Sequence, residues 1–371
     1  MCREGSRWLA VRRILLVVSL VVAVSHPWTR LGADTAPQEA EKVWPFLGGL
    51  PKDQRQAVLE REANREGSLV LYGALGIDRA EFLTKTFNTR YPSIKVNFVR
   101  LTTPDLTEKV LLEHRLGRVA VDAAISEPSQ LLLLQEALAP YEPRAWAEFD
   151  PRFVYGGAAK GWTAAAYELL PSTIAWRTDR VPTKEAPKSL DELADPKWKG
   201  RTGTTTHLES FIANMVTVYG EERGVAKVRR LAQLDNRLYR SHAALGEALA
   251  SGAVDIVWNL GAHRPVKMKG AGQPVDWVFQ DPLFGTGVTI SAVRGAKKPY
   301  AAALFMDFLL EANTLEKLEA LEGGRLFGNR EGKFKYGLAS FPTILLYPPL
   351  PKKHFEELNV LAEKLFFRKQ Y

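Results

Sequence analysis

Three consecutive threonines stand directly before a predicted helix. The run Gly203-Thr204-Thr205-Thr206-His207 reads as a polar loop, and the helix follows from Leu208. Hydroxyl groups and free backbone amides at a helix N-terminus form a cradle for an oxyanion, and His207 would add positive charge near neutral pH. The alternative is that Thr206 serves only as the helix cap. This loop is the strongest single candidate for a binding site.

A second polar group follows the strand that we predict for residues 253–258. Asn259 is suited to binding a ligand through its amide, while His263 and Arg264 supply positive charge. An arginine offers an anion two parallel hydrogen bonds. The alternative is that these are surface residues at a strand end and have no function.

Two earlier loops also follow predicted strands. Gly73-Ala74-Leu75-Gly76 is small enough for a ligand to approach the backbone, although a tight turn explains the glycines equally well. Glu127 is a candidate oxygen ligand for a hard metal cation. The alternative is that Ser126 caps a helix beginning at Pro128, with Glu127 in its first turn.

The elements around these loops predict where the loops lie. Helix patterns at 52–66, 78–91 and 106–116 alternate with strand patterns at 69–72, 94–100 and 121–125. Such alternation indicates an α/β fold with a mostly parallel sheet. Ligands bind such sheets beyond the carboxyl ends of the strands, which is where the candidate loops stand.

The length of 371 residues suggests two domains. A strand-pair pattern over 153–176 marks a crossover between them, and strands at 275–278 and 287–293 carry the chain back. We therefore expect one lobe from residues 51–170 and 285–371 and a second from 171–284. Helices are predicted in the second lobe at 189–193, 209–219, 224–234 and 243–250, and after it at 300–318 and 355–367. Prolines and the Gly48-Gly49 pair predict an irregular leader over 26–50.

The first residues resemble a secretory signal peptide. Four arginines precede the apolar run 14–24, and Ala23-Val24-Ser25 offers the small residues that a signal peptidase reads. The run is too short for a typical membrane span, so an uncleaved anchor is the weaker alternative. We expect residues 1–25 to be removed at Ser25 or later and the mature protein to be periplasmic. Removal takes away Cys2, the single cysteine.

Charge and motifs exclude several classes of protein. Lys and Arg number 50 against 42 Asp and Glu, a net charge of +8, but the basic residues are scattered and accompany no nucleic-acid-binding motif. We expect no nucleic-acid partner. The chain also has no nucleophile elbow, zinc-protease motif or phosphate-binding lysine loop, which argues against an enzyme. Two alternatives remain open: a secreted enzyme on the same two-domain α/β scaffold, and a ligand-sensing subunit for a membrane receptor.

Short motifs follow one another in a characteristic order over residues 50–320. They include Gly67-Ser68-Leu69, Phe87-Asn88, Tyr91-Pro92 and Val121-Asp122, and then the stretches 190–193, 195–200, 246–255 and 301–310. This order resembles the ferric-type extracellular solute-binding proteins of bacterial ABC importers. The resemblance implies a two-lobed type II periplasmic-binding-protein fold, whose lobes close on a small-molecule ligand in the cleft. It also implies delivery to an ABC permease in the inner membrane, and we expect a monomer.

The resemblance breaks down at the ligand set for iron. Ferric binders of this kind usually carry an Asn followed closely by two adjacent tyrosines, but here the residues after Asn259 and Leu260 are Gly261-Ala262. Phenolate oxygens match Fe(III), and Glu127 with His263 would leave the metal under-liganded. The sequence therefore identifies no certain cofactor. We expect Fe(III) to bind only as a chelate or through a set of protein ligands that contains no tyrosine. The expected ligand is a small anion or a ferric chelate.

Overall fold

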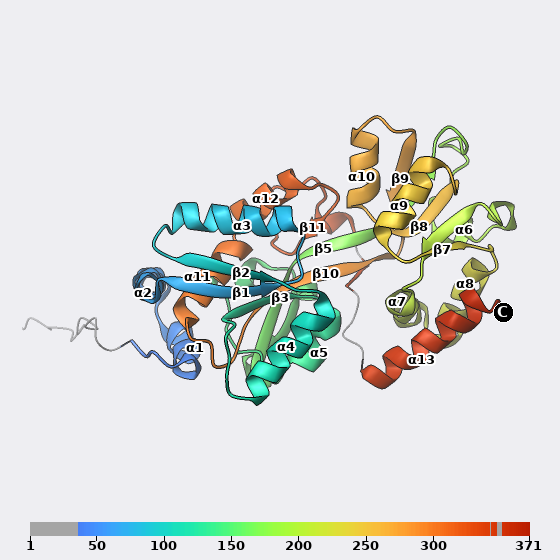
Figure 1. Cartoon of the computed structure of the whole chain (residues 1–371). Helices are drawn as coiled ribbons and strands as arrows, with labels where there is room; N and C mark the ends of the chain where they lie inside the picture. Colours follow the sequence, from blue (N-terminus) through green and yellow to red (C-terminus); the bar gives the residue numbers. More distant parts are fainter. Residues whose placement is uncertain (1–35, 342, 347–350) are drawn as a thin grey trace, which may run out of the picture. The chain divides into compact units, whose positions relative to one another are not determined.

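One long strand, β5 (Trp162–Arg177), belongs to two β-sheets. The computed structural model describes residues 36–341, 343–346 and 351–371, so the predicted signal peptide lies outside the described residues. Through Pro171, β5 pairs with β10 (Leu283–Ala292); from Ser172 it pairs instead with β8 (Ile256–Gly261) and β9 (Val275–Phe279), always antiparallel. Figure 1 shows β5 and β10 side by side as they pass between the sheets.

The first sheet has the strand order β2-β1-β3-β10-β5. Its strands β1, β2 and β3 run parallel, whereas β10 is antiparallel to β3. Short strands extend it, β4 and β11 beside β5 and β12 beside β10. Their bounds are β1 (Ser68–Gly73), β2 (Lys95–Arg100), β3 (Ala123–Ser126), β4 (Val154–Gly157), β11 (Leu326–Phe327) and β12 (Ile344–Leu346). We call this sheet with its helices lobe 1.

Lobe 2 contains the second sheet, in which β8, β6 (Thr202–Thr205) and β7 (Arg237–Tyr239) follow β5 in that order. The pairs β6–β7 and β6–β8 are both parallel. Each lobe has a core of its own. One cluster of buried side chains is centred on Val121 and Leu134 in lobe 1, and another on Phe211 and Trp258 in lobe 2.

Helices connect the parallel strands, as the alternating pattern predicts. The predicted helix over 52–66 has the same bounds in the structure, and a left-handed Gly67 ends it. The helices are α1 (Ala40–Gly49), α2 (Lys52–Glu66), α3 (Ile77–Arg90), α4 (Thr103–Arg115), α5 (Leu131–Leu134), α6 (Leu190–Leu193), α7 (Glu209–Tyr219), α8 (Glu221–Ala232), α9 (His242–Ser251), α10 (His263–Gly270), α11 (Pro299–Leu310), α12 (Ala312–Leu321) and α13 (Lys352–Ala362). The helix predicted over 300–318 is in fact two helices, because the backbone adopts an extended conformation at Glu311.

The leader predicted to be irregular over 26–50 is partly wrong. Residues 40–49 form helix α1, with Pro45 inside it. Val43, Trp44 and Leu47 are buried, and α1 packs against α11. Burial of these apolar side chains outweighs the local cost of the proline.

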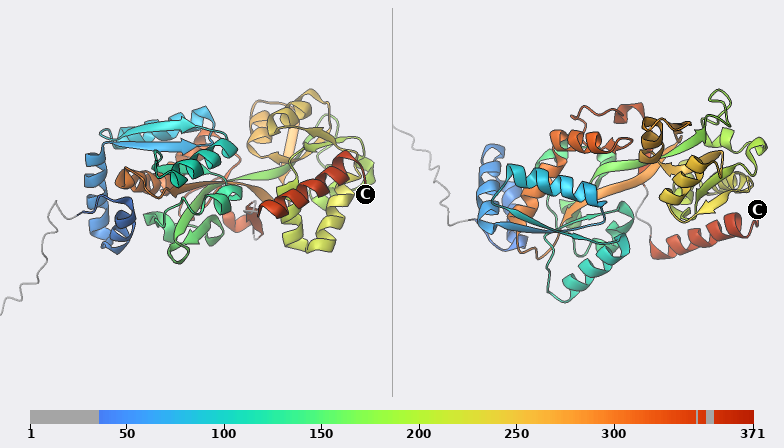
Figure 2. Two further views of the ribbon diagram at one scale, coloured as in Figure 1. Left: turned by 60° about the horizontal axis from the view of Figure 1, so that its bottom comes forward. Right: turned by 45° about the horizontal axis from the view of Figure 1, so that its top comes forward.

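The C-terminal helix departs from the predicted lobe boundary. Residues 285–371 were all expected in lobe 1, yet α13 packs against α7 of lobe 2, as Figures 1 and 2 show. Leu358, Leu365 and Phe366 join the buried cluster of Phe211 and Trp258. This end of the chain therefore completes the core of lobe 2. Among the described residues, no helix is both long and apolar enough to cross a membrane.

Truncating Leu47 tests whether α1 belongs to the folded core. Leu47 is fully buried, so Leu47→Ala is expected to lower the free energy of unfolding by about 2–4 kcal/mol in a denaturant titration. Lys42→Ala on the exposed side of α1 is the control and should cost less than about 1 kcal/mol. Equal, small effects of both substitutions would mean that residues 40–49 contribute nothing to the core.

Candidate functional site

Two sets of loops meet the helices at the carboxyl ends of parallel strands. In lobe 1, β1 leads through Gly76 into α3, and β2 leads through Thr102 into α4. In lobe 2, β7 leads through Ser241 into α9, and β8 runs directly into α10 at His263. Because parallel strands end at one edge of their sheet, each lobe gathers these helix N-termini on one side.

A pocket of about 620 Å³ joins the two sets of loops. Lobe 1 contributes the start of α3, the end of β2 and the segment after α12, while lobe 2 contributes α10. Its volume is typical of a small-molecule site. We call it the cleft pocket, and its lining residues are Gly76, Ile77, Asp78, Arg79, Arg100, His263, Val266, Lys267, Leu321, Glu322, Gly323 and Arg325.

A buried network of charges forms one wall of the cleft pocket. Glu168, fully buried on β5, pairs with Arg79 of α3 and with Arg325, whose Nη1 lies 3.0 Å from the carboxylate. Arg325 also pairs with Glu322 at 2.6 Å. Each carboxylate therefore compensates a guanidinium, as buried charges require.

Positive groups remain available on this wall. Arg79 is 6% exposed, and its Nε and Nη1 donate no hydrogen bond among the described residues; Nη1 lies 3.6 Å from Glu322. Within the described part of the chain, Arg100 donates only through Nε, to the carbonyl of Leu75 at 2.9 Å. No side chain of that part caps the N-terminus of α3 at Gly76. Guanidinium donors and an uncapped helix N-terminus together favour an anion.

Two histidines in lobe 2 are held neutral. Burial, together with the charges of Arg264 and His207, lowers the pKa of His242 to about 4. Burial likewise lowers the pKa of His263 to about 4, with Arg325 acting in the same direction. The backbone N–H of Gly261 donates to Nδ1 of His242 at 3.3 Å. Both imidazoles therefore act as neutral groups at pH 7, and the cations of the site are arginines and lysines.

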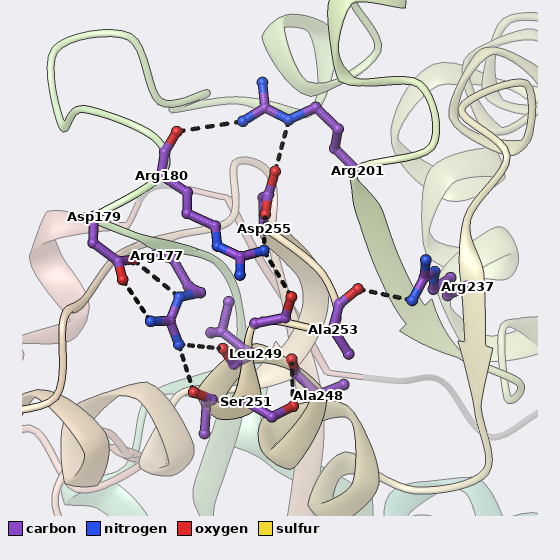
Figure 3. A network of polar contacts seen from close by, with 12 residues as sticks. Arg177, Asp179, Arg180, Arg201, Arg237, Ala248, Leu249, Ser251, Ala253 and Asp255 are labelled. Atoms are coloured by element: carbon purple, nitrogen blue, oxygen red, sulfur yellow. Dashed lines mark hydrogen bonds and ion pairs between the residues drawn. The ribbon is translucent and has the colours of Figure 1, made fainter.

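Helix α9 is fixed at both ends, which places His242. At its start, the hydroxyl of Ser241 accepts a hydrogen bond from the backbone N–H of Ala244. At its end, Arg177 donates to the carbonyls of Leu249 and Ala250. Figure 3 shows this end of the helix, where Arg180 and Arg201 also pair with Asp255. Cations at a helix C-terminus are stabilising because the carbonyls there carry partial negative charge.

Two of the three threonines are not in a loop, which corrects that part of the sequence-based expectation. Thr204 and Thr205 lie in β6 and are buried. The hydroxyl of Thr204 donates to the carbonyl of Trp258 at 3.2 Å, and that of Thr205 to the carbonyl of His207 at 3.4 Å. Thr206 does not cap α7, whose cap position is Leu208. Neither buried hydroxyl lines the cleft pocket.

Other candidates also serve the fold. Asn259 has a left-handed backbone, with a φ of 56°, at the bulge in the β5–β8 pairing, and its side chain accepts a hydrogen bond from Ser172. Ser126 does not cap a helix, because its hydroxyl bonds with Thr289 on β10. The carboxylate of Glu127 accepts a hydrogen bond from Thr103, and burial raises its pKa.

Gly73 is required by a neighbouring ring. A Cβ at Gly73 would lie 2.7 Å from the ring of Phe98. The glycine therefore lets that ring pack directly against the backbone of β1. Ala74 donates its backbone N–H to Ile125, and neither residue lines the cleft pocket. Among the predicted candidates the structure places His263 in that pocket, while Arg264 and His207 are close enough to lower the pKa of His242.

Sequence reasoning missed three charged residues that line the cleft pocket, namely Arg79, Lys267 and Arg325. A signal existed for Arg79, which lies in the first turn of α3. The role of Arg325 depends on a partner 157 residues away, which no local pattern reveals.

The described residues offer no ready site for a bare metal ion. No group of three or more His, Cys, Asp or Glu among them is arranged to hold one. Tyr167 adjoins the buried charges, but burial raises its pKa strongly and keeps it a phenol.

The neutral state of His242 predicts a dependence of stability on pH. The unfolded chain takes up a proton at this residue near pH 6.5, whereas the folded chain takes it up only near pH 4. Stability is therefore lost as the pH falls between these values. The stability advantage of the wild type over His242→Gln is expected to shrink by about 3 kcal/mol between pH 7 and pH 4, measured by denaturant titration. A constant difference would contradict a neutral, buried His242.

Comparisons with known proteins agree with this architecture. The family model described as bacterial extracellular solute-binding protein matches residues 77–313. Iron-bound HitA from Pseudomonas aeruginosa is 18% identical, with a TM-score of 0.66 over 80% of this chain and 99% of that one. No curated protein sequence gives a significant match.

Two further solved structures have different ligands. The Trichodesmium protein IdiA (FutA), in complex with iron and citrate, is 17% identical, with a TM-score of 0.65 over 82% of this chain and 100% of that one. AfuA from Actinobacillus pleuropneumoniae, with fructose-6-phosphate bound, is 19% identical, with a TM-score of 0.60 over 82% of this chain and 97% of that one. These likenesses confirm the two-lobed type II fold. Because the family model covers more than half of it, the chain belongs to the bacterial extracellular solute-binding proteins and is a binding protein of the ABC-transporter type.

Proposed function

We propose that this protein captures a small anionic solute in the cleft pocket and delivers it to an ABC permease in the inner membrane. The observation that carries this proposal is the convergence of Arg79, Arg100, Lys267 and Arg325 on one pocket lined by both lobes. Guanidinium and ammonium groups recognise carboxylate and phosphate oxygens. The neighbours are binding proteins, which favours capture without turnover.

The charges of the pocket leave an excess for the ligand. Glu168 and Glu322 compensate Arg79 and Arg325. Arg100 and Lys267 are exposed and form no ion pair within the described residues. Asp78 at the pocket wall reduces the excess but lies in the first turn of α3, where a negative charge stabilises the helix. An anion bound in the pocket would neutralise the remaining positive charge.

Capture is expected to draw the two lobes together. Arg100 belongs to lobe 1 and Lys267 to lobe 2, so an anion held by both is bound more tightly when they approach. The chain crosses between the lobes on β5 and β10, where the pairing partner of β5 changes at Ser172. We propose this crossing as the hinge, since hinge closure around a ligand uses a few residues at element ends.

The proposed solute is an anion or an anionic ferric chelate and not bare iron. The pocket supplies cationic donors, whereas Fe(III) requires anionic oxygens. Iron with citrate in one neighbour and fructose-6-phosphate in another are both ligands with anionic groups. A ferric chelate would present carboxylate or phosphate oxygens to the same arginines.

Titration calorimetry with phosphate, citrate and ferric citrate tests the proposal. At least one of these is expected to bind, and Arg100→Gln is expected to weaken it about ten-fold or more, because a charged hydrogen-bond donor is lost. Arg118→Gln, at an exposed position outside the pocket, is the charge-matched control and should keep the affinity. The proposal fails if no anion binds, or if both variants behave alike.

A further inference from the structure

A second hollow adjoins the cleft pocket. It has a volume of about 510 Å³ and lies between α3 and β2. Ala80 and Thr84 of α3 form one wall, and Phe98 of β2 forms the other. Ile77 and Arg100 line both hollows, so the two are neighbours. We call the second hollow the side pocket.

The side pocket exposes apolar surface that the fold itself does not cover. Ile77, which lines it, is 57% exposed. The ring of Phe98 lies against Gly73, where a Cβ would lie 2.7 Å from it, so this close contact requires the glycine. Exposed apolar surface next to a charged pocket is typical of a ligand groove. Covering it would add roughly 25 cal/mol for each Å² removed from water.

Arg100 stands at the junction of the two pockets. Its Nε donates to the carbonyl of Leu75, which fixes the plane of the guanidinium. The terminal nitrogens have no hydrogen bond or ion pair among the described residues. A ligand whose anionic group binds these nitrogens can therefore extend past Ile77 into the side pocket.

Polar residues of the side pocket limit what fits. Thr84, Glu81 and Lys85 also line it, and the last two are exposed charged residues. A long acyl chain would cover more of these polar groups, and burying them without partners is costly. A compact apolar group, such as an aromatic ring, would contact Ile77, Ala80 and Phe98 and cover fewer of them.

We propose that the solute is amphiphilic: a carboxylate or phosphonate head bound at Arg100 in the cleft pocket, carrying a compact apolar substituent that occupies the side pocket. This inference rests on the proposed function, because it uses the same anion site. It goes further in naming the class of solute. Plain inorganic anions would then be weak ligands, because they leave the apolar surface uncovered.

The test compares methylphosphonate with phenylphosphonate by titration calorimetry on the purified protein. Phenylphosphonate is expected to bind at least about ten-fold more tightly, since its ring is removed from water. Ile77→Ser should reduce the ratio of the two dissociation constants several-fold. Leu112→Ser replaces an apolar residue of similar exposure, 55%, on α4 outside both pockets, and should keep the ratio.

The outcomes separate the two proposals. If both phosphonates bind equally well, or if Ile77→Ser and Leu112→Ser leave the same ratio, the side pocket does not take the substituent and this inference is wrong, while anion capture stands. If neither phosphonate binds, and phosphate, citrate and ferric citrate also fail, the anion site itself is refuted. A ring preference that Ile77→Ser abolishes supports the inference.

Discussion

The carboxylate of Glu168 lies fully buried on the strand that both lobes share, and two guanidinium groups surround it. Arg79 reaches it from α3 and Arg325 from the segment after α12. Removing one member of such a group would leave an uncompensated buried charge, which costs about 3–5 kcal/mol. The network therefore ties α3 and the end of α12 to β5, and it fixes the wall of the cleft pocket.

The same network explains why the pocket remains charged without a ligand. Glu168 satisfies part of each guanidinium, yet Nε and Nη1 of Arg79 make no hydrogen bond among the described residues. Both nitrogens are buried, so the positive charge of Arg79 lies within the pocket wall. In lobe 2, Arg177 and Arg180 hold the C-terminal end of α9 by donating to the carbonyls of Leu249 and Gly252.

The sequence predicts the architecture well wherever local pattern decides it. The helix at 52–66 and the strands of the first sheet follow from apolar spacing and from glycine and proline positions. The crossover over 153–176 likewise corresponds to β4 and β5. Residues 40–49 were misjudged, because the burial of Trp44 and Leu47 against distant helices outweighs Pro45 and two glycines.

The site was harder to predict, because its members are brought together by tertiary pairing. Thr204 resembles a loop residue in a polar run, but β6 is a strand because β7 and β8 pair with it on either side. Arg79, Glu168 and Arg325 lie on three separate elements. Their ion pairs form only when the tertiary fold brings these elements together, so no local pattern predicts them. By contrast, His263 lines the cleft pocket, and the sequence points to it because it follows a strand at the edge where parallel sheets bind ligands.

The central claim is that the anion binds at the arginines of the cleft pocket and not at the threonine run. Crystals grown with selenate, an oxyanion whose selenium scatters anomalously, would locate it directly. The account predicts a selenium peak in the cleft pocket, beside Arg79 and the start of α3. The selenate oxygens should lie within hydrogen-bonding distance of the guanidinium of Arg100. A peak at Thr204–Thr206 instead, with the cleft pocket empty of selenium, would contradict it.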